Sequence, residues 1–147
     1  MTHNTYIYKG DLCVMSMHLF FEFLNAAVGT MAFALLFQVP KQYYVNCGII
    51  GGCGWLCYKL LLSGCGLFAS TFFATVLVVF LSRLSAVQRH CPVTVFLIAG
   101  IFPLVPGAGI YWTAYYVVTD QLTKASARGF LTLKIAVAIV LGILFVF

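Results

Sequence analysis

The chain has 147 residues, of which 63% are hydrophobic and only 7% are charged. This composition excludes an ordinary soluble domain and indicates a polytopic helical membrane protein. The apolar runs are continuous rather than alternating, which excludes a transmembrane β-barrel. The net charge of +5 comes from scattered single Lys and Arg residues, which argues against a nucleic-acid partner. We therefore expect one all-α, multi-pass domain over residues 1–147, with about five spans.

The first half of the chain contains three predicted spans, at residues 12–37, 44–62 and 67–82. Pro40 disfavours helix in the residue before it, so it ends the first span. The segment Ser63-Gly64-Cys65-Gly66 predicts a tight turn between the second and third spans. Gly48 and Gly52 lie one helical turn apart, and such a pair of small residues lets another helix approach closely. We predict that they pack on a neighbouring span.

The fourth predicted span, residues 91–120, is broken between Phe102 and Gly109, with the centre of the break at Pro103 to Gly107. Two prolines and two glycines in eight residues interrupt a helix, because each proline removes a donor and clashes with the preceding turn. Broken spans are tolerated in membranes where they are buried in protein or line a cavity, and they often form transporter binding sites. The flanking predictions are a polar connection at 83–92, a loop at 119–128 and a fifth span at 129–147.

The first span carries a polar stripe made of His18, Glu22, Asn25 and Gly29. At 100° per residue these positions share one helix face, which we expect to point into the bundle. An acid inside a span is costly and is a candidate functional residue by default. We predict proton coupling at Glu22, assisted by His18 and Asn25. The alternative is that Glu22 and His18 lie near the interface and pair with each other or with a lipid headgroup.

A second stripe follows the break and consists of Gly109, Thr113, Tyr116 and Asp120. The free N–H groups and the positive dipole end of a helix that starts near Gly107 suit a carboxylate. The predicted substrate-binding residues are therefore Pro106, Gly107, Ala108, Gly109, Ile110, Thr113 and Tyr116, and Asp120 joins the proton-coupling group. The alternative is a simple kink, whose glycines only allow close packing.

The sequence gives little indication of a metal site, of catalysis or of a cofactor. The six cysteines include no Cys-x-x-Cys pair, and His90 and Cys91 are adjacent, which is poor zinc spacing, so we expect no metal. The chain has neither a nucleophile motif nor a second membrane acid to pair with Glu22, so we expect neither an enzyme nor a cofactor. Lys59 lies near a predicted span end and is expected to reach the interface.

Three segments resemble a known family: Phe37-Gln38-Val39-Pro40, Gly52-Cys53-Gly54-Trp55-Leu56-Cys57-Tyr58 and, most specifically, Ile101-Phe102-Pro103-Leu104-Val105-Pro106-Gly107. The chain resembles the small five-span component of the threonine/serine exporter (ThrE) family. The resemblance implies proton-driven export of threonine, serine or small carboxylates across the bacterial cytoplasmic membrane. It also implies a larger membrane partner of the same family. A homo-oligomer, a non-transporting scaffold and a passive channel stay open as alternatives.

Overall fold

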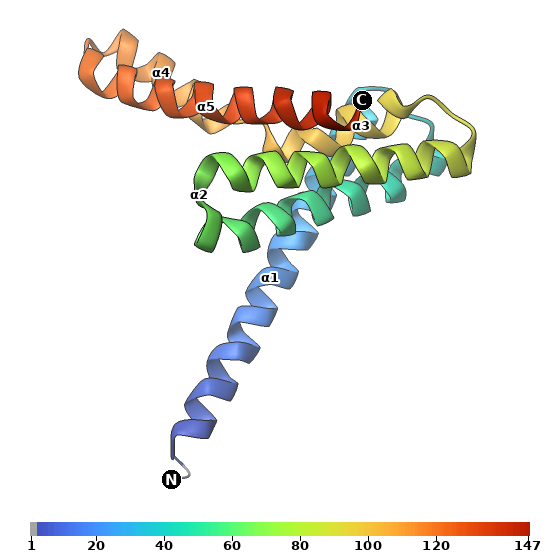
Figure 1. Ribbon diagram of the computed structural model, residues 1–147, viewed down its shortest axis with the longest axis horizontal. Coiled ribbons are helices and arrows are strands. Elements are labelled where there is room, and N and C mark those ends of the chain that lie inside the picture. Colours follow the sequence, from blue (N-terminus) through green and yellow to red (C-terminus); the bar gives the residue numbers. More distant parts are fainter. Residues whose placement is uncertain (1–2) are drawn as a thin grey trace.

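A computed structural model of the protein describes residues 3–147, with side chains from residue 17 onward. Within these residues the secondary structure is helical, which confirms the predicted all-α class. The helices are α1 (His3–Leu36), α2 (Tyr44–Arg89), α3 (Val93–Ile101), α4 (Gly107–Val118) and α5 (Leu122–Val146). Two short 3-10 turns, η1 (Lys41–Tyr43) and η2 (Phe102–Leu104), precede α2 and follow α3 (Figure 1).

Three helical segments are long and apolar enough to cross a membrane: Met17–Leu36, Lys41–Arg89 and Leu122–Val146. The bent pair Val93–Leu104 and Gly107–Val118 counts as a fourth. The second of these segments, at 49 residues, is far longer than the roughly 20 residues that one span needs. Because it folds back on itself, it supplies two membrane-length arms, so the described residues hold five such elements when the bent pair counts as one, in line with the predicted number.

The fold-back in α2 occurs at Gly66, where φ is 78° and ψ is 170°. This backbone conformation is open to glycine and strained for other residues. The two arms of α2 lie side by side in Figure 1, and Gly54 of the first arm lies against Val78 of the second. These two residues are equally distant from Gly66 along the chain, so the arms form an antiparallel hairpin around it. The predicted turn at 63–66 therefore lies at the observed reversal.

Glycines opposite threonines bring the helices together. The pairs are Gly51 with Thr30 (α2 and α1), Gly142 with Thr75 (α5 and α2), Gly109 with Thr132 and Gly129 with Thr113 (both α4 and α5). Each of these threonine hydroxyls donates to a carbonyl four residues earlier in its own helix. The threonines therefore need no polar partner across the interface, and the glycines permit close approach. Gly48 and Gly52, predicted to pack on a neighbouring span, face Met31 and Phe23 of α1.

The fourth span is broken where the sequence predicts. The α3–η2 and α4 segments meet at an angle of 53°. At the break the N–H of Val105 bonds to the carbonyl of Phe102 at 3.1 Å, and the N–H of Gly107 bonds to that of Val105 at 2.8 Å. Tight turns thus replace helical hydrogen bonds where Pro103 and Pro106 lack donors.

Two predicted boundaries are wrong. The polar connection expected at 83–92 is shorter, because α2 continues to Arg89. Arg83 stays helical and donates to the carbonyl of Val146, at the end of α5, at 2.9 Å. The loop expected at 119–128 is also shorter, because α5 begins at Leu122. Charged residues are good helix formers, so they mark the edge of the apolar layer rather than the end of the helix.

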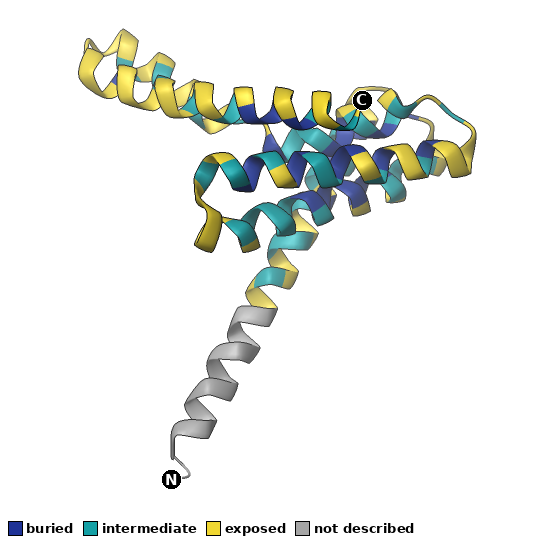
Figure 2. Cartoon of the chain, in the orientation of Figure 1, coloured by how far each residue is buried: buried dark blue, intermediate teal, exposed yellow. Residues whose placement is uncertain are grey.

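The α4–α5 hairpin extends beyond the α2 turn and is largely uncovered (Figures 1 and 2). Within residues 107–118 of α4 no side chain is fully buried. The exposed set is aromatic and aliphatic, including Tyr111, Trp112, Tyr115 and Val118. Apolar exposure of this kind is expected of a surface that faces lipid or another membrane chain.

Candidate functional site

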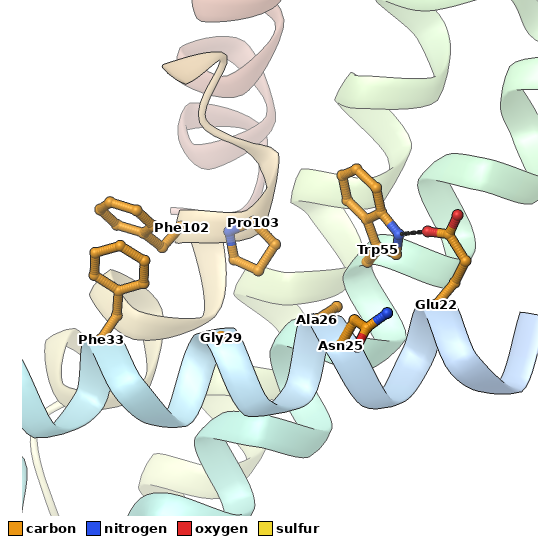
Figure 3. Close-up of a pocket in the computed structure, with 8 residues that line it drawn as sticks. All are labelled: Glu22, Asn25, Ala26, Gly29, Phe33, Trp55, Phe102 and Pro103. Atoms are coloured by element: carbon orange, nitrogen blue, oxygen red, sulfur yellow. Dashed lines mark hydrogen bonds between the residues drawn. The ribbon is translucent and has the colours of Figure 1, made fainter. Parts of the chain in front are cut away.

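A first cavity lies between α1, the first arm of α2 and the break. Its volume is about 290 Å³, and eight residues line it: Glu22, Asn25, Ala26, Gly29, Phe33, Trp55, Phe102 and Pro103. Figure 3 shows the α1 residues along one wall, with Phe102 and Pro103 of the break and Trp55 of α2 around them. The rings of Phe33 and Phe102 stack and hold α1 against the break. Three residues of the first predicted stripe, Glu22, Asn25 and Gly29, thus share one cavity with the broken span.

Glu22 is the charged centre of this cavity. Its Oε2 accepts a hydrogen bond from the indole Nε1 of Trp55 at 2.6 Å, drawn as a dashed line in Figure 3. Its Oε1 lies 3.2 Å from the Nζ of Lys59 and 4.0 Å from the Nδ1 of His18. Lys59 therefore pairs with Glu22, a contact that the expected reach of Lys59 toward the interface did not include. The His18 side chain is 75% exposed, so Lys59 is the closer and better covered partner of Glu22.

A second cavity, of about 470 Å³, lies on the other side of the break, between α2, α4 and α5. Its lining includes Pro106, Gly107, Ala108 and Gly109, four of the predicted substrate-binding residues. Arg128 of α5 adds a cation to the same lining. This cavity therefore combines backbone at the start of α4 with a positive side chain, a combination that suits an anionic group.

The first turn of α4 contains backbone N–H groups that can donate hydrogen bonds to a ligand. The N–H of Ile110 bonds to the carbonyl of Pro106 at 3.0 Å, and that of Gly107 is taken by Val105. Among the backbone hydrogen bonds of the described residues, the N–H groups of Ala108 and Gly109 have no acceptor outside their own helix. Unsatisfied N–H groups at a helix start are the ones that bind carboxylates and phosphates.

The remaining predicted residues lie elsewhere. Ile110 and Thr113 line a shallow hollow against α5. Tyr116 belongs to an aromatic group with Trp112 and Tyr115, and its ring lies 5.9 Å from the Nζ of Lys124. Asp120 does not continue the second stripe, because α4 ends at Val118 and Asp120 lies exposed in the following turn with φ of 59°. The structure thus gathers the start of α4 around the second cavity and leaves its outer half outside.

Sequence reasoning did not single out Trp55, Pro103 or Arg128 as site residues. Trp55 lies midway between Tyr44 and Gly66, the two ends of the first α2 arm. Tryptophans in membrane proteins gather at the interfaces, so one in the middle of a span is a signal that could have identified it. Arg128 was predicted to lie in a loop. Because α5 begins earlier than predicted, Arg128 is helical and lines the second cavity.

The fold and these cavities define a multi-span helical membrane protein built around a broken span. Residues 22–147 match the sequence model of the family described as Threonine/Serine exporter, ThrE. The match covers most of the chain, and the protein belongs to this family. A membrane location follows at that level, and the resemblance noted in the three sequence segments is confirmed.

A relative from Haemophilus influenzae, described as an uncharacterized protein, is 30% identical over 101 residues. The alignment covers 68% of this chain and 34% of the relative, so the matched region is about a third of that protein's length. No solved structure matches the chain.

Proposed function

We propose that the protein is a subunit of a proton-coupled secondary exporter of threonine, serine or small carboxylates. It would act with a larger membrane partner in the bacterial cytoplasmic membrane. The observation that carries this proposal is the first cavity, in which Glu22, an acid of the first candidate span, and the break of the fourth span line one space. Transporters commonly place their substrate and coupling ions where a discontinuous helix meets ionisable side chains near the bilayer midplane.

Glu22 is the proposed coupling residue. Its carboxylate is held by two donors, Trp55 and Lys59, from the neighbouring helix. A proton or a substrate ammonium that reaches Glu22 competes with these donors for the same two oxygens. Binding of either cation therefore changes contacts between α1 and α2, which is the kind of differential contact that a coupled transporter requires.

The start of α4 is the proposed carboxylate site. The N–H groups of Ala108 and Gly109 and the guanidinium of Arg128 border the second cavity, and each favours negative charge. A carboxylate is common to amino acids and to small organic acids, so this site admits both proposed substrate classes. An amino acid also carries an ammonium group, for which Glu22 is the matching acid.

The larger partner is proposed from the family and from length. The H. influenzae relative is about three times as long as the region it shares with this chain. The uncovered α4–α5 hairpin offers apolar surface to another membrane chain or to a second copy of this one. Transporter folds usually contain paired repeats. Five spans cannot be divided into two equal halves, which also favours a partner chain.

The test is reconstitution in proteoliposomes with an imposed pH gradient, with the chain alone and together with its larger family partner. The proposal predicts gradient-dependent export of L-threonine or L-serine by the pair. Export that ignores the pH gradient would favour a passive channel. Export by the partner alone, at the same rate with and without this chain, would favour the scaffold role.

A further inference from the structure

Two residues, Trp55 and Pro103, line both cavities. The two cavities are therefore neighbours, and these side chains stand between them. Pro103 belongs to the η2 turn, where its ring fixes the backbone. Trp55 approaches from α2, and Figure 3 shows both side chains among those that line the first cavity.

The linings of the two cavities reach different ends of the first α2 arm. The first reaches Phe33, one turn before α1 ends at Leu36 beside the η1 turn. The second reaches Leu67, next to the α2 reversal at Gly66. The η1 turn and Gly66 lie at opposite ends of the first α2 arm, about 33 Å apart at 1.5 Å per residue. Trp55 lies midway between them.

We propose that Trp55 is a gate between the two cavities, and that the cavities are the two halves of one substrate path. This inference rests on the proposed function, because a path implies transport. The closed position is the one observed: the indole borders both cavities and is fixed by its bond to Glu22. Pro103 forms the rigid side of the gate, and the Trp55 side chain forms the movable side.

The turn of α2 that precedes Trp55 carries no side chains at positions 51 and 52. A helical side chain lies over the turn that precedes its own Cα, which for Trp55 means positions 51 and 52. Both positions are glycine, so no side chain of α2 itself fills that surface. The indole is half-buried, and it lies beside Tyr58 at a ring-centroid distance of 5.5 Å. A change of rotamer must therefore break the bond to Glu22 and pass Phe23 and Thr30 of α1, which lie against Gly52 and Gly51.

Glu22 connects the gate to the cations that reach the cavity. Trp55 Nε1, Lys59 Nζ and His18 Nδ1 all face its two carboxylate oxygens, Lys59 and Trp55 from α2 and His18 from α1 itself. A charged acceptor makes a stronger hydrogen bond than a neutral one, so a proton or an ammonium on Glu22 weakens the hold on the indole. Release of Trp55 then joins the two cavities.

The direct test measures passive flux of radiolabelled L-serine and L-threonine in proteoliposomes that hold the complex without a pH gradient. Trp55→Ala removes the gate and should raise passive flux on the order of tenfold above wild type. Trp55→Phe keeps an aromatic ring but loses the N–H donor, so its passive flux should stay closer to wild type while its coupled export falls. Trp112→Phe, a change to the chain's other tryptophan on the outer part of α4, is the matched control and should match wild type in both.

The outcomes separate the gate from the proposed function. If wild type exports under a pH gradient and folded Trp55→Ala shows no added passive flux, the gate is rejected and the exporter stands. If Trp55→Ala leaks while wild type shows no coupled export, the coupling is rejected and the gate stands. If both tests fail, both proposals are rejected.

If Trp55→Ala does not fold, a second measurement tests whether Trp55 is a gate. In the Trp112→Phe protein Trp55 is the sole tryptophan, so its fluorescence reports on the gate. Saturating L-threonine should release the indole, shift its emission to longer wavelength and raise its quenching by iodide. An unchanged spectrum under conditions where threonine binding is measured directly would overturn the gate.

Discussion

The indole nitrogen of Trp55 donates to the Oε2 of Glu22 at 2.6 Å, and this single contact ties the middle of α2 to the one acid of α1 that lines the first cavity. Hydrogen bonds to a carboxylate are stronger than those to neutral acceptors, typically about 1.5–3 kcal/mol. The bond therefore joins the proposed coupling residue to an aromatic side chain that borders both cavities.

Glu22 and Lys59 should behave as an ion pair across the α1–α2 contact. Their nearest atoms are 3.2 Å apart, so Glu22→Lys places two cations together and should lower thermal stability in detergent. Adding Lys59→Glu restores opposite charges and should recover most of that loss. Both side chains are partly exposed, at 24% and 38%, so the coupling energy should be about 1 kcal/mol or less. Additive effects of the two substitutions would contradict the pair.

Gly107→Val should reduce substrate binding without unfolding the protein. A Cβ added at Gly107 meets no other atom within 4 Å, so the side chain fits, but it occupies space at the second cavity. We expect weaker binding of L-threonine, measured by scintillation proximity on the purified protein. Gly109→Val is the informative comparison: its Cβ meets Thr132 of α5, so it should destabilise the α4–α5 hairpin itself. Normal affinity in Gly107→Val would mean that the break is only a kink.

Gly142→Leu should lower thermal stability, because the added side chain forces α5 away from α2. A Cβ at Gly142 would lie 2.8 Å from the Cβ of Thr75 and 3.1 Å from the carbonyl oxygen of Phe72. Overpacking of this kind costs about 1–3 kcal/mol. The measurement is the thermal unfolding midpoint in detergent. Gly64→Leu is the matched control, because its added side chain meets nothing within 4 Å and should leave the midpoint nearly unchanged.

Gly66→Ala should weaken the α2 hairpin through the backbone rather than through packing. Space is open around Gly66, but its φ of 78° with ψ of 170° disfavours a residue with a Cβ, at a cost of about 1–3 kcal/mol. Thermal unfolding compared with Gly64→Ala isolates this effect, since both glycines lie in the same turn segment. Equal midpoints for the two variants would show that the reversal tolerates side chains.

The break and the α2 turn could be predicted from sequence because proline and glycine act locally. The register of Glu22, Asn25 and Gly29 could also be predicted, since helical periodicity holds along an unbroken segment such as α1. Asp120 was misplaced because the periodicity was extended past the true end of α4 at Val118. Trp55 and Arg128 were missed because their role depends on how α2 and α5 pack around the break, which no local pattern encodes.

The most direct test of the account is Glu22→Gln in proteoliposomes with the larger partner and an imposed pH gradient. Glutamine keeps the shape and still accepts the Trp55 bond, but it carries no titratable proton. We expect the complex to assemble with unchanged elution and proton-driven export of L-threonine or L-serine to be abolished. Export at the wild-type rate, with the same dependence on the pH gradient, would contradict Glu22 as the coupling residue.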